Sequence, residues 1–393
     1  NENFTQIYAN DKIEFHRLCT FDTVKARYVK LTVEKSDNLP KIREMEIYNA
    51  VPEKKNDFRV STYSTLGGSV FGIIDDTTLS DAEKDAKIKE LIDADYYDTV
   101  TDYIDIGNVR WDEEGIIHTD GWDGIERDED KYYAVMMRNL HEVLDEKGVN
   151  LVITILNPSG ENGNQKVMKS ITENRDTLIT NMIAFANKYE FDGIDLDWEF
   201  PMSQDEFDAY NSFLQELKAR MKTEMWNKED ATLSLALGTW ALKYTPEAIE
   251  CIDYVNVMGY DILDQDGQHS SFFSSCVQAA DYIESRGFSK EQINIGFPFY
   301  GTWEGGRMEQ YAYNAISEEI SPFNNFYTMK KSDTKEDRYT YFNSQAIIRD
   351  KTAYAYLKGY GGVMIFSQYC DLPSDDERSL TKAISDYLQE VTK

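Results

Sequence analysis

The sequence is poor in cysteine, in histidine and in positive charge. Its 393 residues include four cysteines and four histidines, and 41 Lys and Arg stand against 71 Asp and Glu, a formal net charge of -30. The scattered cysteines form no C-x-x-C pair, which excludes a disulfide framework and the common zinc and redox motifs. Nucleic acid and anionic membrane surfaces are excluded as partners, because phosphate binding depends on clustered Lys and Arg.

Long hydrophobic runs are also missing. The longest strand-like run, residues 149–156, is far shorter than the ~20 residues that a membrane-spanning helix needs, so no membrane partner is expected. The first residues have neither an initiator Met nor the pattern of a signal peptide, which favours a fragment or mature piece of a longer protein. The histidines show no ligand spacing, so no metal and no cofactor is expected.

Two changes in composition divide the chain. Residues 27–33 and 42–48 alternate apolar and polar side chains, the pattern of half-buried antiparallel strands. A charged stretch follows, and after it short strands alternate with longer amphipathic helices. We therefore predict an N-terminal β segment at 1–50, a linker at 51–57 and a larger third domain at 58–393.

The third part has the pattern of an α/β protein. Helices are predicted at 176–189 and at 203–225, the second opened by a Ser203-x-x-Glu206 capping box. Eight strand-helix units fit a (β/α)8 TIM barrel with an insertion after strand seven, whereas the glycine motifs of a doubly wound nucleotide-binding sheet are missing. The eight predicted strands are 59–63, 99–107, 150–156, 193–199, 232–239, 253–260, 294–299 and 362–367.

One predicted strand carries a row of acids. Side chains alternate between the two faces of a strand, so Asp195, Asp197 and Glu199 share one face while Trp198 lies on the other with its apolar neighbours. Three carboxylates facing a barrel lumen repel one another, so at least one pKa should lie well above its ordinary value of ~4. A solvated face on an edge strand is the alternative, but the bulky apolar residues in between disfavour it.

A carboxylic acid kept protonated by its neighbours is what general-acid catalysis requires. Glu199 is the natural donor because it is nearest to the carboxyl end of the strand, where barrel active sites lie. A glycosidic oxygen is the leading acceptor of its proton. Carboxylates on one strand cannot also attack the opposite face of the sugar, so either another strand or the substrate itself supplies the nucleophile.

The acidic segment, beginning at Asp192 and Gly193, resembles the D-G-x-D-x-D-W-E signature of glycoside hydrolase family 18, the chitinase-like hydrolases. The resemblance covers roughly residues 57–393. Residues 255–261 resemble the M-x-Y-D segment of the family's sixth strand, and 296–301 and 361–366 resemble its downstream segments. The family's third-strand S-x-G-G is missing, and Phe366 stands where most members have Trp.

This resemblance implies that the 2-acetamido oxygen of the substrate attacks the anomeric carbon and forms an oxazolinium intermediate. By the same resemblance Glu199 is the general acid and then the base, Asp197 orients the acetamido group, and Asp195 shares its proton or charge. Tyr260 donates to the acetamido carbonyl, and Met258 and Asp261 line the same pocket. The other substrate-binding residues predicted are Tyr63, Trp198, Trp303 and Phe366, with Asp192 and Gly193 as support of the motif.

Residues 22–33 and 42–48 are similar to the closing strands of a discoidin-type β-sandwich, a fold used by family 32 carbohydrate-binding modules. About a third of such a module is present, so we expect a truncated remnant.

The function predicted is retaining, substrate-assisted hydrolysis of β-1,4-linked N-acetylglucosamine in chitin or chito-oligosaccharides. Two alternatives stay open: an endo-β-N-acetylglucosaminidase that cuts the chitobiose core of N-glycans, and a lectin that binds chitin without cutting it. The expected partner is a carbohydrate containing N-acetylglucosamine. A monomer and a secreted or cell-surface location are expected.

Overall fold

The computed structural model describes most of the chain beyond residue 56. The described residues are 4–10, 19, 21–36, 39–40, 42, 45, 47, 57–93, 98–120, 125, 127–262, 273–303, 306–316, 321, 325–330, 337–373 and 375–392.

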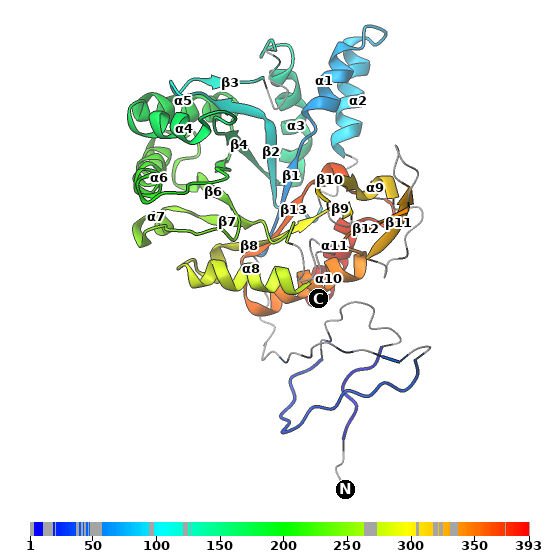
Figure 1. Cartoon of the computed structure of the whole chain (residues 1–393). Helices are drawn as coiled ribbons and strands as arrows, with labels where there is room; N and C mark the ends of the chain where they lie inside the picture. The colour runs from blue at the N-terminus through cyan, green and yellow to red at the C-terminus, as the bar shows by residue number, and fades with distance from the viewer. Residues whose placement is uncertain are drawn as a thin grey trace.

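Eight parallel strands close into a barrel, which confirms the predicted (β/α)8 fold (Figure 1). β1 pairs in parallel with β13 on one side and with β2 on the other, and this second pairing closes the sheet. A two-residue strand, β3 (Ile117–His118), adds an antiparallel extension to β2. The barrel strands are β1 (Arg59–Ser64), β2 (Asp102–Trp111), β4 (Asn150–Leu156), β5 (Gly193–Leu196), β6 (Thr232–Leu237), β7 (Tyr254–Val257), β8 (Ile293–Pro298) and β13 (Gly362–Phe366).

Helices surround the barrel (Figure 1). The predicted capping box at Ser203 and Glu206 is present and opens the longest of them, α6. No helix in the described ranges is long and apolar enough to cross a membrane. The helices outside the insertion are α1 (Gly67–Asp75), α2 (Asp81–Asp93), α3 (Tyr133–Lys147), α4 (Gly163–Thr172), α5 (Arg175–Lys188), α6 (Gln204–Glu224), α7 (Pro246–Cys251), α8 (Phe273–Ser285), α10 (Gln345–Lys358) and α11 (Leu380–Thr392).

The alternation of side chains along the strands produces two apolar clusters. On β2, Tyr103 and Val109 belong to the large core between strands and helices, whereas Ile104 and Ile106 belong to a smaller cluster. The smaller cluster contains side chains from several strands of the barrel, as expected for a packed lumen. Its buried members are Tyr63, Ile104, Ile106, Val152, Tyr260, Tyr300 and Met364.

The insertion after strand seven is present, because an antiparallel sheet follows β8, the seventh strand of the barrel. It contains β9 (Tyr300–Trp303), β10 (Gly306–Ala312), α9 (Tyr313–Ile316), β11 (Phe326–Lys330) and β12 (Asp337–Tyr341). The hydroxyl of the buried Tyr313 donates to the carbonyl oxygen of Arg378 at 2.9 Å, which ties the insertion to the chain before α11.

The N-terminal strands predicted at 27–33 and 42–48 are not found among the described residues of these stretches. Residues 27–33 carry no strand assignment, and Tyr28 is 67% exposed. In Figure 1 this part of the chain is an extended trace below the barrel. Alternation of side chains predicts a strand only where a neighbouring strand supplies hydrogen bonds, since an isolated strand pair is at best marginally stable.

A buried acid lies between the barrel and its helices. Asp105 on β2 accepts hydrogen bonds from the hydroxyl of Tyr133 at 2.9 Å and from Nδ2 of Asn108 at 2.7 Å. No cation pairs with it among the described residues. Burial raises the pKa of Asp105 to about 7, against the lowering effect of these two hydrogen bonds.

We predict that Asp105→Asn increases stability most at alkaline pH. Because the folded-state pKa lies above the unfolded value, the folded protein binds the proton more tightly, and stability falls as pH rises from about 4 to about 7. The amide cannot ionise, so the variant should gain on the order of 3 kcal/mol over the wild type at pH 8 and little at pH 4. Urea unfolding at both pH values measures the gain; a difference that does not change with pH would contradict this prediction.

Candidate active site

The acidic row opens into a cavity at the carboxyl ends of the barrel strands. β5 ends at Leu196 rather than at the predicted Glu199, so Asp197 and Glu199 belong to the segment that leaves the strand. The cavity measures about 610 Å³. Its lining residues are Tyr63, Ile106, Leu156, Asp197, Glu199, Ala236, Gly238, Thr239, Trp240, Met258, Tyr260, Asp261, Ile262, Tyr300 and Phe366.

Asp195 is the innermost acid of the row, fully buried and held by three hydroxyl groups. Oδ2 accepts from Thr154 at 2.7 Å and from Tyr63 at 3.0 Å, and Oδ1 accepts from Ser234 at 2.6 Å. Burial raises the pKa of Asp195, although these hydrogen bonds lower it in part. Asp195 is therefore fixed in place and has no route to solvent of its own.

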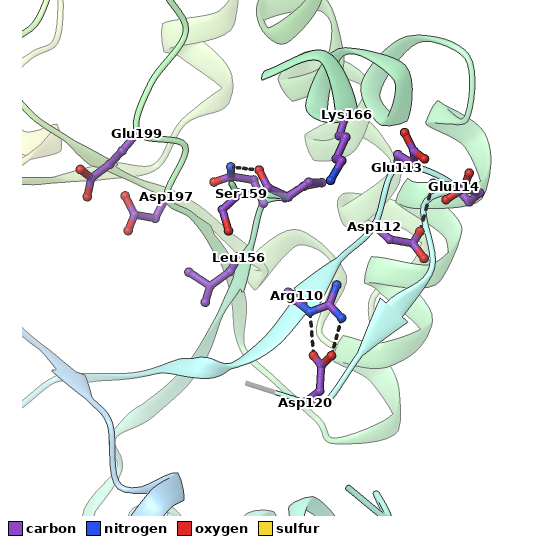
Figure 2. A pocket seen from close by; sticks show the side chains of 12 residues that line it. Arg110, Asp112, Glu113, Glu114, Asp120, Leu156, Ser159, Lys166, Asp197 and Glu199 are labelled. Carbon is purple, nitrogen blue, oxygen red and sulfur yellow. Dashed lines mark hydrogen bonds and ion pairs between the residues drawn. The ribbon is translucent and has the colours of Figure 1, made fainter. Parts of the chain in front are cut away.

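Asp197 and Glu199 lie nearer the mouth, and their carboxyl groups lie beside each other (Figure 2). Burial, followed by the charges of Glu199 and Asp195, raises the pKa of Asp197 well above its ordinary value. Its Oδ1 is buried and accepts no hydrogen bond from a described residue. Burial and the charge of Asp261 raise the pKa of Glu199. The row can therefore hold protons at a pH where isolated carboxylic acids have lost theirs.

Aromatic rings form one wall of the same cavity. Tyr260 stacks on Phe366 with ring centroids 6.1 Å apart, and Tyr300 meets both rings edge to face. Tyr63 contacts the edge of Phe366 and also donates its hydroxyl proton to Asp195. Met258 is partly buried and packs against this group. Such a wall suits the apolar face of a sugar ring, with the hydroxyl of Tyr260 beside it.

Asp261 faces the cavity from the loop after β7. Its backbone adopts a left-handed conformation with φ of 56°, which Asp tolerates better than most residues. The hydroxyl of the buried Tyr300 donates to its Oδ2 at 2.8 Å. Asp261 is thus held where its charge acts on Glu199.

Replacing Asp261 with Asn should move the alkaline limb of the pH-rate profile to lower pH. A general acid works only while protonated, and loss of the Asp261 charge lowers the pKa of Glu199. The measurement is kcat/KM for a chito-oligosaccharide from pH 4 to 9. Asp205→Asn, on the exposed first turn of α6, is the control and should leave the limb in place. An alkaline limb that stays put or rises in the Asp261 variant would contradict this role.

A second cavity of about 610 Å³ shares Leu156, Asp197 and Glu199 with the first. Figure 2 shows its far side, where the guanidinium of Arg110 grips both carboxylate oxygens of Asp120. None of the described side chains that line it is aromatic. They are Arg110, Asp112, Glu113, Glu114, Asp120, Leu156, Asn157, Pro158, Ser159, Lys166, Asp197 and Glu199.

Some predicted site residues lie away from both cavities. Trp198 is buried in the outer core, where its ring meets Tyr210 edge to face, so its placement argues against the predicted contact with substrate. Asp192 accepts from the backbone N–H of Leu151 at 2.8 Å at the start of β5. A Cβ on Gly193 would meet Oγ1 of Thr232 at 2.1 Å, so this glycine permits close approach of β6. Both residues of the motif therefore support the strand.

The side chain of Trp303 lies outside the described part of the chain. The structure brings the remaining predicted residues together at the first cavity. They are Tyr63, Asp197, Glu199, Met258, Tyr260, Asp261 and Phe366, with Asp195 directly beneath.

Sequence reasoning missed Thr154 and Ser234, which hold Asp195 together with Tyr63, and it missed Tyr300, which holds Asp261. Thr154 and Ser234 are polar residues inside otherwise apolar predicted strands on either side of the acidic one, and that pattern could have indicated them. Tyr300 is the first residue of β9, and it lies in the segment 296–301, whose resemblance to the family gave it no role in the site. Among the residues that the structure describes, no group of three or more His, Cys, Asp or Glu side chains is arranged to hold a metal ion.

The model of the family described as glycosyl hydrolases family 18 matches residues 128–371, more than half of the chain. The chain belongs to this family. The match includes Glu199, Tyr260 and Phe366, and Tyr63 lies before it. Family 18 membership therefore rests on the part of the barrel that carries the acidic row.

The chain is also similar to individual proteins. It is 26% identical to a class V chitinase of Arabidopsis thaliana over 44% of this chain and 52% of that protein. It is 38% identical to killer toxin subunits alpha/beta of Kluyveromyces lactis over 23% of this chain and 9% of that protein. The crystal structure of a chitinase from Bacteroides thetaiotaomicron has a TM-score of 0.62 at 20% identity, covering 85% of this chain and 97% of that one. The chain thus spans about half or less of the length of these two curated relatives, and the crystal structure supports the fold.

Proposed function

We propose that this family 18 chain hydrolyses β-1,4-linked N-acetylglucosamine in chitin or chito-oligosaccharides. The observation that carries the proposal is the row of Asp195, Asp197 and Glu199, which rises from a buried, hydroxyl-bonded acid to one that faces an aromatic-walled cavity. Curated relatives that the chain resembles in part are chitinases, which supports the same substrate class.

In the first step the acetamido oxygen of the substrate bonds to the anomeric carbon as the bond to the leaving sugar breaks. Glu199 gives its proton to the departing glycosidic oxygen, so the leaving sugar departs as a neutral alcohol. Asp197 accepts a hydrogen bond from the acetamido N–H and so orients the group. Tyr260 donates a hydrogen bond to the acetamido oxygen. The product of this step is a cyclic oxazolinium held in the cavity.

In the second step water attacks the anomeric carbon from the side that the leaving group vacated. Glu199, now ionised, removes a proton from that water, and the acetamido group returns to its original form. Two displacements at one carbon retain the β configuration. The raised pKa of Glu199 suits both halves of this cycle, because the same group must release and then recover a proton.

Hydrolysis of N-glycan cores by an endo-β-N-acetylglucosaminidase is the second candidate. The second cavity favours it, because a wall of charged and amide groups without described aromatic rings suits a branched, polar glycan. Mass spectrometry of products from chitotetraose and from a high-mannose glycoprotein separates the two. Cleavage of chitotetraose supports the first candidate, release of glycans supports the second, and retention of chitotetraose without cleavage would instead support a lectin.

We also propose that residues 1–50 derive from a discoidin-type carbohydrate-binding module and that the protein acts as a monomer outside the cell. The alternating apolar residues at 27–33, exposed in this chain, support a missing sheet partner. Light scattering tests whether the protein is a monomer. Detection of the protein in culture medium tests whether it lies outside the cell.

A further inference from the structure

The carboxyl group of Glu199 makes no hydrogen bond to another residue in the described part of the chain. Its position therefore depends on the backbone that carries it, between Trp198 and Phe200. Trp198 is buried, whereas Phe200 is 38% exposed. What holds these two neighbours decides where the acid points.

One side chain bonds to both neighbours. Asn164, in the first turn of α4, accepts a hydrogen bond from the indole Nε1 of Trp198 at 3.1 Å. Its Nδ2 donates to the carbonyl oxygen of Phe200 at 3.3 Å. The same amide thus grips the chain immediately before and immediately after Glu199.

Asn164 is itself anchored to the start of α6. Its Nδ2 also donates to Oε1 of Glu206 at 3.2 Å, so both amide protons are used. Oε2 of Glu206 accepts from the backbone N–H groups of Met202 at 2.7 Å and of Ser203 at 2.8 Å. Four hydrogen bonds, to Trp198, Phe200, Met202 and Ser203, therefore tie this segment to α4 and α6.

We propose that Asn164 is a positioning residue for Glu199, an inference that rests on the function proposed above. The site needs an amide, because Asn offers one acceptor for Trp198 and two donors for Phe200 and Glu206. An Asp at this position has nearly the same shape and can still accept from Trp198, but it cannot donate and it repels Glu206. A displacement of about 1 Å in a catalytic group is enough to lower a rate by ~100-fold.

Two substrates with different leaving groups distinguish a misplaced Glu199 from general damage to the site. A sugar leaving group needs the proton of Glu199, whereas 4-nitrophenolate leaves without one. Moreover, kcat/KM reports on the steps up to the first irreversible bond cleavage, so the later use of Glu199 as a base does not affect it. A defect confined to the position of Glu199 should therefore affect chitotetraose far more than 4-nitrophenyl β-chitobioside.

The experiment compares the wild type with Asn164→Asp on these two substrates. We expect kcat for chitotetraose to fall about 30-fold with KM changed less than about 3-fold, and kcat/KM for the nitrophenyl substrate to fall less than about 3-fold. Trp198→Phe removes the indole donor, keeps an aromatic ring and leaves the Glu206 contact intact. Trp198→Phe should also lose more activity on chitotetraose than on the nitrophenyl substrate, by a smaller factor. This second variant keeps the test valid if Asn164→Asp does not fold.

Asn181→Asp on α5 is the matched control. That amide donates to the carbonyl oxygen of Gly115 at 2.8 Å, and neither residue lines the two cavities. Its loss should change the rates on both substrates equally or not at all. Equal losses on both substrates in the Asn164 and Trp198 variants, or unchanged kcat for chitotetraose, would overturn the positioning role alone. A wild type that cleaves neither substrate would overturn the proposed function and this inference with it.

Discussion

Glu199→Gln is expected to lower kcat on chitotetraose by about 1,000-fold or more while the oligosaccharide still binds. Glutamine keeps the shape of the side chain but has no proton to give to the glycosidic oxygen, and general-acid catalysis contributes about 10²–10⁴-fold. The cavity wall of Tyr260 and Phe366 is untouched by the change, so the KM or the dissociation constant should stay within a few-fold. Chromatography of products and calorimetric titration measure the two quantities.

The nitrophenyl substrate provides the control for this variant. Because nitrophenolate needs no proton, kcat/KM for 4-nitrophenyl β-chitobioside should survive better than kcat/KM for chitotetraose. A Gln variant that keeps more than a tenth of wild-type turnover on chitotetraose would remove Glu199 from the role of acid.

Asp197→Asn is expected to lower kcat by about 100–1,000-fold, and here the leaving group should not matter. The buried Oδ1 of Asp197 accepts no hydrogen bond from a described residue, which leaves it available for the acetamido N–H. An amide at this position turns either a donor or a weaker acceptor toward that group, and the loss of one oriented polar contact in a buried site is worth about 10²–10³-fold. Attack by the acetamido oxygen is needed for sugar and nitrophenyl leaving groups alike.

Steady-state kinetics of the Asp197 variant on both substrates therefore tests whether Asp197 orients the acetamido nucleophile. The Glu199 variant tests whether Glu199 donates the proton. A variant that loses activity on chitotetraose but retains full activity on the nitrophenyl substrate would assign Asp197 to proton delivery instead. Asp208→Asn on the exposed face of α6 is a suitable control of matched chemistry, and it should leave both rates unchanged.

Much of the barrel and the acidic row could be predicted because both depend on short-range patterns. The apolar run at 150–156 forms β4 with the predicted bounds, and the capping box at Ser203 begins α6. Alternation placed Asp195 on one face and Trp198 on the other, and the structure has them there. In each case the feature depends on residues that are close in sequence or on the alternation of side chains along a strand.

The features that could not be predicted depend on contacts between segments that are distant in the sequence. The hydroxyl groups on Asp195 come from three other strands, and the amide that contacts Trp198 comes from α4, 34 residues earlier. Nothing local to the acidic strand indicates them. The strand predicted at 27–33 is wrong because a strand also depends on a distant contact. Its pattern requires a partner strand, and the described part of the chain does not supply one.

The most direct test is to follow wild-type hydrolysis of chitotetraose by proton NMR and to record which anomer appears first at the new reducing end. Substrate assistance with Glu199 as acid and base predicts the β anomer first, followed by slow mutarotation to the equilibrium mixture. Initial formation of the α anomer, or an oligosaccharide that stays intact in the presence of folded protein, would contradict it.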